Sequence, residues 1–369
     1  MPALRLLNVT KRFGALKAID DVTFEVKDRE YLCVLGSTGS GKTTLLRSIA
    51  GIIRPDDGDI YLDGERVTGV PAEERNSVYV PQTYALFPHM TVLENVMFGP
   101  LAKETNKSIA EETAIRVLRL VRLNNRADAY PNELSGGMQQ RVALARGLSS
   151  GAKLLLLDEP LGALDVRLRL ELRTELRKLA KESGLTVIHV THDQEEAMTI
   201  GDRILVLRKG KLQQLGTPYH VYNRPEQIFV ANFVGNTNFL EAIVQSRSKE
   251  GSTLRLREGL TVRVSDYSFE NDEAVILSIR EENTSITSEP RGDESNRLSG
   301  EATAVYFLGS FIRYVVKLTN GDEIAARVPI KEVDAEIKQG DWVSISFDPT
   351  NTHVYEYPTL GLQGELEAS

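Results

Sequence analysis

The apolar positions in the first two thirds of the chain follow two spacings. Unbroken apolar runs at Tyr31–Leu35 and at residues 154–157 indicate strands buried on both faces, which is typical of a parallel sheet. After the first run, Leu45, Leu46 and Ile49 recur at helical spacing. This alternation of buried strands with helices predicts an α/β fold for this part of the chain.

Several shorter features extend the α/β prediction. Gly51 follows the first helical pattern and is placed to end that helix. The segment between residues 82 and 134 is predicted to be mostly helical, with Ser108 and Glu111 at the spacing of a capping box and apolar residues at 115, 118 and 121 on one face. Leucines at positions 164, 168, 172, 176 and 179 predict a further helix that packs into the core.

From about residue 236 the pattern changes to alternation of apolar and polar residues. The segments "STLRLR", "LTVRVSD", "EAVILSI" and "WVSISF" show this alternation, and turn-forming residues separate them. Many short strands of this kind predict an all-β domain, a small barrel or pair of barrels of the OB type. Residues 281–300 contain almost no apolar side chains, so we expect an exposed, mobile loop there.

Composition narrows the possible partners and location. The length of 369 residues is enough for two or three domains, and a hydrophobic content of 41% can fill a core in each. The net charge of −8 argues against non-specific binding to nucleic acid or to an anionic membrane. Cys33 is the single cysteine and no leader-like segment precedes the first strand, so we expect a protein of the reducing cytoplasm. No run approaches the roughly 20 apolar residues that span a bilayer, so any membrane-spanning part would belong to partner chains.

The stretch "GSTGSGKTT" lies between the first predicted buried strand and the following helix. It fits the pattern G-x-x-x-x-G-K-[ST], in which backbone N–H groups surround a phosphate chain, the lysine adds positive charge and the hydroxyl reaches Mg²⁺. A glycine-rich turn without a ligand would not explain the strand, the spacing and the lysine together. Alone, the loop predicts only that a nucleoside triphosphate binds, which leaves kinases, GTPases and motor proteins open. The predicted nucleotide-binding residues of this loop are Gly36, Ser37, Thr38, Gly39, Ser40, Gly41, Lys42, Thr43 and Thr44.

Two carboxylates follow the second buried run, in "AKLLLLDEP". They stand at the carboxyl end of a predicted parallel strand, where ligands of open α/β sheets bind. We expect Asp158 to hold Mg²⁺ through water and Glu159 to accept a proton from an attacking water molecule. Alone, the pair could also be solvated acids before a turn at Pro160.

The string "LSGGMQQR" supplies a second predicted helix start that can face an anion, with Ser135, Gly136 and Gly137 at its opening. With this string the chain resembles the nucleotide-binding cassette of ABC transporters. The resemblance covers roughly residues 4–235 and includes six motifs in the order that the family has them. It departs from the family in having Gly162 in place of a common serine, and Thr38 and Ser40 at permissive loop positions.

The resemblance implies roles for residues outside the phosphate loop. An aromatic residue in "KRFG" would lie against adenine, the glutamine of "VPQTYALF" would touch Mg²⁺ and sense a transmembrane partner, "GALD" would cross between subunits, and the histidine of "VTHDQEEA" would contact the γ phosphate. The implied nucleotide-binding residues are Phe13, Gln82, Ser135, Gly136, Gly137, Gln139 and Asp165. The implied metal ligands are Thr43, Gln82 and Asp158, and the implied catalytic residues are Glu159 and His192.

In the family, two cassettes pack head to tail and hold each ATP between the phosphate loop of one and the Ser135 helix of the other. The sequence has one cassette and no internal repeat, so the resemblance implies a second copy of the chain, with a heterodimer left open. It also implies two transmembrane permease subunits, docked in a groove with residues 84–92 as its floor, and an extracytoplasmic solute-binding protein acting through them. The chain would then lie peripherally on the cytoplasmic face of the membrane.

The strings "FLGSFIRYVV" and "FDPTNTHVY" resemble the transport-associated OB (TOBE) repeats of importers for polyamines, ferric iron and sugars. We therefore expect an ATP-binding cassette in residues 1–235, with a helical subdomain at about 83–150, and an OB-like regulatory or dimerisation domain in residues 236–369. The expected activity is Mg²⁺-dependent ATP hydrolysis that drives solute import. Exporters and soluble ABC ATPases of DNA repair or translation are the alternatives, while the acidic charge disfavours nucleic-acid binding by the β domain.

Overall fold

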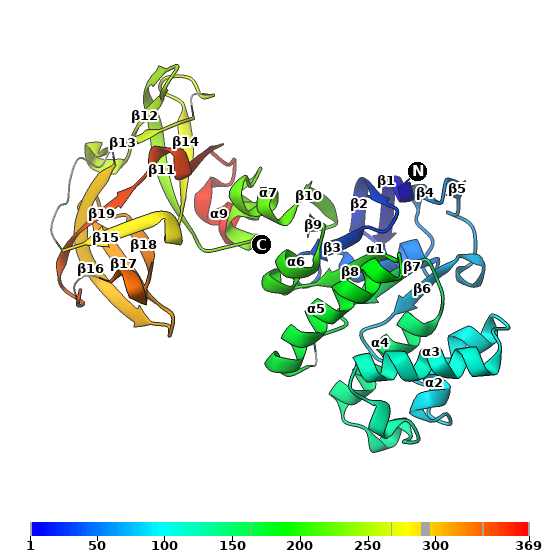
Figure 1. The fold of residues 1–369 in the computed structure, drawn as a ribbon. Helices are drawn as coiled ribbons and strands as arrows, with labels where there is room; N and C mark the ends of the chain where they lie inside the picture. Colours follow the sequence, from blue (N-terminus) through cyan, green and yellow to red (C-terminus); the bar gives the residue numbers. More distant parts are fainter. Residues whose placement is uncertain (1, 163, 267, 289–295, 334–335, 368–369) are drawn as a thin grey trace. The chain divides into compact units, whose positions relative to one another are not determined.

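The computed structural model describes residues 2–162, 164–266, 268–288, 296–333 and 336–367. Contacts within the chain divide it into two units, residues 1–223 and residues 224–369 (Figure 1). The boundary expected after residue 235 refers to functional domains and stays a prediction.

A six-stranded sheet forms the centre of the first unit, in the order β10-β9-β3-β8-β7-β6. Neighbours from β9 to β6 run parallel, and β10 is antiparallel to β9. The strands are β3 (Tyr31–Leu35), β6 (Ser77–Val80), β7 (Leu154–Asp158), β8 (Thr186–Thr191), β9 (Arg203–Arg208) and β10 (Lys211–Gly216). Strands β3 and β7 are buried along their whole length, which confirms the interpretation of both apolar runs.

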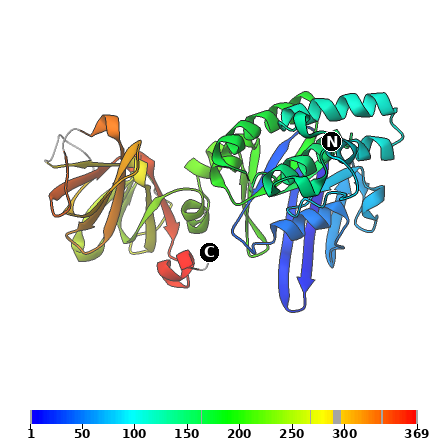
Figure 2. The same cartoon turned by 90° about the horizontal axis from the view of Figure 1, so that it is seen from below.

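A second, antiparallel sheet in the order β2-β1-β4-β5 completes the strands of this unit. Its strands are β1 (Pro2–Phe13), β2 (Leu16–Lys27), β4 (Asp57–Leu62) and β5 (Glu65–Arg66), and Figure 2 shows β1 and β2 as a long hairpin. Helix α1 (Lys42–Ala50) contributes Leu45, Leu46 and Ile49 to a core shared with both sheets. It ends at Gly51, whose φ of 82° is the left-handed conformation predicted for that glycine.

Three helices between β6 and β7 pack against one another: α2 (Val92–Ala102), α3 (Lys107–Leu120) and α4 (Gly136–Ser149) (Figure 1). The capping box expected at Ser108 is wrong, because Asn106 starts α3 two residues earlier and accepts a 2.9 Å hydrogen bond from the Ser108 N–H. The remaining helices of the unit are α5 (Val166–Glu182), α6 (Gln194–Ile200) and α7 (Pro218–Asn223). Leu172 and Leu176 of α5 are buried, as the leucine spacing predicts.

The second unit is an all-β domain of the OB type, which confirms the expected fold class. Two five-stranded antiparallel sheets, β13-β12-β11-β14-β20 and β15-β19-β16-β17-β18, share one apolar core. The amide of Asn238 joins them, because it donates to the carbonyl oxygen of Ala325 at 2.8 Å and accepts from the Ala325 N–H at 2.7 Å. The elements are α8 (Ile228–Phe233), β11 (Thr237–Ser248), β12 (Gly251–Arg255), β13 (Thr261–Val264), β14 (Ala274–Arg280), β15 (Thr284–Thr287), β16 (Arg297–Phe307), β17 (Phe311–Leu318), β18 (Glu323–Pro329), β19 (Trp342–Phe347), β20 (Thr352–Glu356) and α9 (Gly361–Glu367).

The loop expected at residues 281–300 is wrong at both ends. Strand β15 pairs with β19, and β16 pairs with the same strand on its other side. Ile286 and Leu298 are the apolar residues of this polar segment, and both pack against the core of the second unit. The middle of the expected loop, residues 289–295, lies outside the described residues. None of the helices in the described part of the chain combines the length and the apolarity that crossing a membrane requires.

Candidate nucleotide site

The loop between β3 and α1 is shaped by glycines that neighbouring backbone approaches closely. Gly41, at the start of α1, has a φ of 104°, and a Cβ there would lie 2.2 Å from the carbonyl oxygen of Ala18. A Cβ on Gly36 would lie 2.4 Å from the carbonyl oxygen of Leu207. Any other residue at these positions would displace the loop, so the two glycines hold its N–H groups at the helix start, where a phosphate chain binds.

Two side chains of the loop have unused capacity for an anion. Lys42 is 6% exposed, and its Nζ donates 2.9 Å hydrogen bonds to the carbonyl oxygens of Gly36 and Ser37. Burial lowers the pKa of Lys42, although Glu159 and Asp158 oppose that shift. The Oγ of Ser40 is buried and has no hydrogen-bond partner among the described residues. A buried cation and an unpaired hydroxyl on one loop fit the phosphates of ATP.

A second cluster joins the start of α1 to the end of β7. The Thr43 hydroxyl donates to Oδ1 of Asp158 at 3.0 Å, and the Tyr79 hydroxyl donates to Oδ2 at 2.9 Å. Asp158 is 1% exposed. Burial raises the pKa of Tyr79, so this hydroxyl stays a donor. Sequence analysis missed Tyr79, because only the parallel pairing of β6 with β7 brings it beside Asp158.

This cluster fits Mg²⁺ in the form that phosphate-binding sites use. The described residues contain no group of three or more His, Cys, Asp or Glu side chains able to hold a metal by themselves. Mg²⁺ commonly takes one or two protein oxygens and completes its shell with water and substrate phosphates. The hydroxyl of Thr43 and the carboxylate of Asp158, 3.0 Å apart, are oxygen ligands of that kind.

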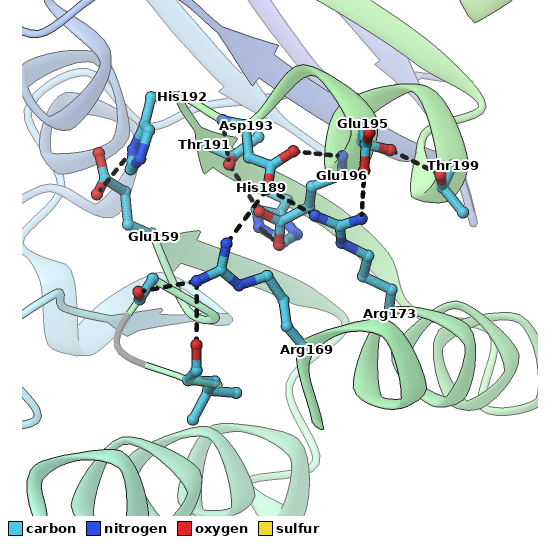
Figure 3. Close-up of polar contacts among 12 residues, drawn as sticks. Glu159, Arg169, Arg173, His189, Thr191, His192, Asp193, Glu195, Glu196 and Thr199 are labelled. Atoms are coloured by element: carbon cyan, nitrogen blue, oxygen red, sulfur yellow. Dashed lines mark hydrogen bonds and ion pairs between the residues drawn. The ribbon is translucent and has the colours of Figure 1, made fainter. Parts of the chain in front are cut away.

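Glu159 is the centre of a third group of contacts. Its Oε2 accepts a 3.2 Å hydrogen bond from Nε2 of Gln82. The same oxygen lies 3.2 Å from Nδ1 of His192 (Figure 3). The backbone of Glu159 has a φ of 49°, a left-handed conformation that is unusual for a residue with a side chain. A carboxylate held in that conformation beside a histidine and an amide is suited to accept a proton from water.

A pocket of about 770 Å³ brings these groups together. The predicted residues that line it are Phe13, Thr38, Gly39, Gly41, Lys42, Thr43, Thr44, Gln82, Glu159 and His192. Phe13 is 50% exposed, as a ring available for stacking would be. Leu16, Lys17, Ala18 and Lys209 also line the pocket and were not predicted, because they are brought there by the β1–β2 and β9–β10 turns rather than by a motif.

Nine predicted residues do not line the pocket. Four of them, Gly36, Ser37, Ser40 and Asp158, belong to the phosphate loop and to the Asp158 cluster described above, and the other five lie on other segments. Ser135 caps α4 by accepting from the Met138 N–H at 3.4 Å, and Gly136 and Gly137 follow it as the first residues of the helix. Gln139 donates its amide to the carbonyl oxygens of Pro131 and Leu134, and Asp165 caps α5. None of the five lines the pocket. Within one chain, these five residues therefore lie outside the pocket that the phosphate loop of the same chain lines.

A separate groove of about 270 Å³ lies between β6, α2 and α4. Ala85 and Phe87, from the segment expected to form the floor of a docking groove, line it together with Phe98. The rings of Phe87 and Phe98 are 4.5 Å apart, and the guanidinium of Arg146 lies 5.0 Å from the centre of the Phe87 ring. The segment thus packs against α2 and α4 and forms one wall of the groove.

Comparisons with known proteins give a consistent result. A family model described as ABC transporter matches residues 19–162, and one described as TOBE domain matches residues 277–355. The chain is 40% identical to the spermidine/putrescine import ATP-binding protein PotA of Rubrobacter xylanophilus, covering 94% of this chain and 92% of that protein. It is 41% identical to PotA of Trichormus variabilis, covering 88% of this chain and 86% of that protein.

Solved structures extend the comparison to three dimensions. A dimeric bacterial ABC transporter cassette is similar with a TM-score of 0.55 and 33% identity, over 58% of this chain and 98% of that one. The dimeric post-hydrolysis state of an ATP-binding cassette bound to ADP and Pi gives a TM-score of 0.54 at the same identity and coverage. The similarity is thus to a complete cassette, in one case with the products of ATP hydrolysis bound.

Proposed function

This chain belongs to the ABC transporter family, as the ATP-hydrolysing subunit of an importer with a TOBE domain, and we propose that it drives the uptake of a polyamine of the spermidine and putrescine class. The observation that carries the proposal is identity near 40% to polyamine import proteins across both units of the chain. The ATP pocket has its expected catalytic side chains in contact, which supports turnover rather than binding alone.

We further propose that two copies of the chain share each ATP. The support is the separation described above, since the Ser135 helix and Asp165 lie outside the pocket that holds Lys42 and Glu159. The solved cassettes that resemble the chain are dimers. The first turn of α4, with the N–H groups of Gly136 and Gly137, would then face the γ phosphate bound by the other copy.

Within each half-site the chain's residues have separate tasks. Phe13 would stack on adenine, Lys42 and the loop N–H groups would hold the β and γ phosphates, and Thr43, Asp158 and Gln82 would hold Mg²⁺. When bound there, Mg²⁺ would offset the negative charge of the phosphates. Glu159 accepts the proton of the attacking water, and His192 contacts the γ phosphate. Both Gln82 and His192 contact Oε2 of Glu159 in this structure, so the other carboxylate oxygen, Oε1, is the one that can take the proton.

We also propose that two membrane-spanning permease subunits dock on the groove lined by Phe87 and Phe98, which would place the chain on the cytoplasmic face of the membrane as a peripheral subunit. A solute-binding protein outside the membrane would deliver the solute to those subunits. The proposed domains are the cassette in residues 1–235, its helical subdomain at about 83–150, and the OB-like domain in residues 236–369.

The test of the polyamine assignment is uptake by native cells that lack this chain. We expect labelled spermidine and putrescine to stop entering, while ferric iron and sugar uptake continue. The wild-type chain should restore uptake, and Glu159→Gln should not, because it removes the proton acceptor and keeps the shape of the side chain. Loss of iron or sugar uptake instead would refute the polyamine assignment and leave the importer intact. Unchanged uptake of all these solutes would refute both proposals.

A further inference from the structure

Arg169, on the first turn of α5, contacts the loop that follows Glu159 and the loop that carries His192 (Figure 3). Its Nη2 donates to the carbonyl oxygen of Leu164 at 3.0 Å and to that of Gly162 at 3.4 Å. Its Nη1 lies 3.5 Å from Oδ2 of Asp193. One planar guanidinium therefore joins the loop that precedes α5 to the loop that precedes α6.

The second of these loops is anchored on both sides of His192. The residue before it, Thr191, accepts a 3.0 Å hydrogen bond at its hydroxyl from the Asp193 N–H. Asp193 itself caps α6, because its Oδ1 accepts from the Glu196 N–H at 2.9 Å. The position of the His192 side chain is thus set by where Thr191 and Asp193 are held.

Thr191 is fixed from the core. Its hydroxyl donates to Oε2 of Glu196 at 2.7 Å, and the other oxygen of Glu196 lies 3.2 Å from Nε2 of His189. The hydroxyl of Tyr31 lies 2.9 Å from the remaining ring nitrogen of His189. Glu196 is 4% exposed, Tyr31 is 1% exposed and His189 is fully buried, so this side of the His192 loop is tied to β8 and β3 and has little freedom to move.

Asp193 is fixed differently. Arg173, which is 4% exposed, donates to its Oδ2 at 2.6 Å and already supplies the positive charge that the carboxylate needs. The longer contact from Arg169 is not required to neutralise Asp193. The position of the Arg169 guanidinium instead depends on Gly162 and Leu164, because its Nη2 donates hydrogen bonds to their carbonyl oxygens.

The contacts close into a ring that contains both catalytic residues. From Glu159 the ring passes through its carbonyl oxygen, which accepts from the Gly162 N–H at 3.3 Å, and then from the Gly162 carbonyl oxygen to Arg169. It continues through Asp193 to His192, whose Nδ1 returns to Oε2 of Glu159 at 3.2 Å. A shift of Gly162 and Leu164 must therefore change either the Arg169 contacts or the spacing between Glu159 and His192.

We propose that Arg169 is a positioning residue that couples the loop at residues 162–165 to His192, so that contact of this loop with the second copy of the chain sets the geometry of Glu159 and His192. This inference rests on the proposed ATP site shared between two copies. It adds a route by which contact with the second copy would change the positions of Glu159 and His192. Arg169 does not line the ATP pocket of its own chain, and the contacts described here join it to the two loops.

Steady-state ATP hydrolysis by the purified full chain tests the coupling. For Arg169→Gln we expect kcat to fall at least about tenfold, because a small misplacement of catalytic groups has effects of that size, while KM for ATP changes less than about twofold. The Hill coefficient for ATP should fall towards one. Arg169→Lys should behave like Arg169→Gln, because an ammonium group keeps the charge but cannot span both loops as a guanidinium does.

Arg167 offers a matched control on the same helix turn. Its side chain is 90% exposed, and the ion pair that it forms within the described part of the chain is with Glu171, at 3.6 Å, so Arg167→Gln should keep kcat, KM and the Hill coefficient. The double variant of Arg169→Gln with Asp193→Asn should lose little more activity than the more severe single variant, because both interrupt the same ring. Melting temperatures separate positioning from folding, and we expect Arg169→Gln to melt within about 3 °C of the wild type.

Wild-type kcat and Hill coefficient in Arg169→Gln would overturn the inference. Full rescue by Arg169→Lys would also overturn it, since charge alone would then suffice. If Arg169→Gln fails to fold, Arg169→Lys and Asp193→Asn carry the same test. Failure of the shared site is recognised separately, because Glu159→Gln would then stay monomeric in Mg-ATP. A trapped Glu159→Gln dimer with an unaffected Arg169→Gln would refute only the role of Arg169.

Discussion

The side-chain amide of Gln140 donates a 3.0 Å hydrogen bond to the main-chain carbonyl oxygen of Glu159. Gln140 is buried in α4, four residues beyond the first residue of that helix, whose N-terminus we propose to face the ATP of the partner. The backbone of Glu159 is left-handed, a conformation that persists only where surrounding groups hold it. The helix that we propose to meet the partner's nucleotide thus also supports the backbone of Glu159, the proposed general base of its own chain.

Glu159→Gln is expected to keep ATP affinity and to lower kcat at least about 100-fold, since general-base catalysis contributes roughly that much or more. The amide retains the size of the side chain and its contact with Gln82, but cannot take a proton from water. Equilibrium titration with ATP measures the affinity, and single-turnover hydrolysis measures the rate. Light scattering in saturating Mg-ATP should show a stable dimer. A variant that hydrolyses ATP at the wild-type rate would remove Glu159 from the mechanism.

Tyr79→Phe is expected to raise the Mg²⁺ concentration needed for half-maximal ATPase activity by about tenfold, because a partner that orients a metal-binding carboxylate typically has an effect of that size. The substitution removes the 2.9 Å hydrogen bond to Asp158 and keeps the aromatic ring. ATP binding in the absence of Mg²⁺ should be unchanged and serves as the internal control. An unchanged Mg²⁺ dependence would show that Tyr79 has no part in orienting Asp158.

Phe98→Glu is expected to abolish recovery of the permease subunits when the chain is isolated from gently solubilised membranes. Phe98 lines the groove of α2, is 41% exposed, and would place a charge in an apolar contact. Leu101→Glu is the matched control, because Leu101 is on the same helix and 43% exposed but does not line the groove. Equal recovery of two multi-span subunits by both variants would locate the docking surface elsewhere.

Glu196→Gln is expected to make the free energy of unfolding fall less steeply as the pH is lowered into the acid range. Burial raises the pKa of Glu196, but its contacts with His189 and Thr191 outweigh that effect and lower the pKa below the usual value. A carboxyl group with a lowered pKa stabilises the fold above its unfolded pKa, and this stabilisation is lost as the pH falls through the folded pKa. Urea unfolding from about pH 6 down to about pH 3, a range that extends below the usual carboxyl pKa, measures it. The wild type should lose more stability than the variant over that interval, and parallel curves would contradict the assignment.

Most of the ATP site could be predicted because its residues lie in short, ordered strings. The phosphate loop needs only local backbone geometry, and its neighbours Asp158 and Glu159 end a strand that the apolar run of β7 makes plain. Tyr79, Gln140 and Arg169 could not be found this way. Each contacts a residue of the site, or a loop that carries one, from a different element. Which elements meet is decided by strand order and helix packing, not by spacing along the chain.

The two errors in secondary structure have local causes. Ser108 and Glu111 have capping-box spacing, but Asn106 is an equally good cap two residues earlier and defines the start of α3. The polar segment around residues 281–300 has one apolar side chain at each end, Ile286 and Leu298, and each is enough to seat a strand on a core that the other strands already form. Composition over a window cannot register such single anchors.

The two hydrogen bonds between Asn238 and Ala325 join two sheets and also cover backbone groups at the edge of one of them. Ala325 lies on β18, the last strand of its sheet, where an unpaired N–H and C=O invite pairing with a strand of another molecule. The amide of Asn238 occupies both groups as a peptide unit of a neighbouring strand would. At this position one side chain protects the chain against edge-to-edge aggregation.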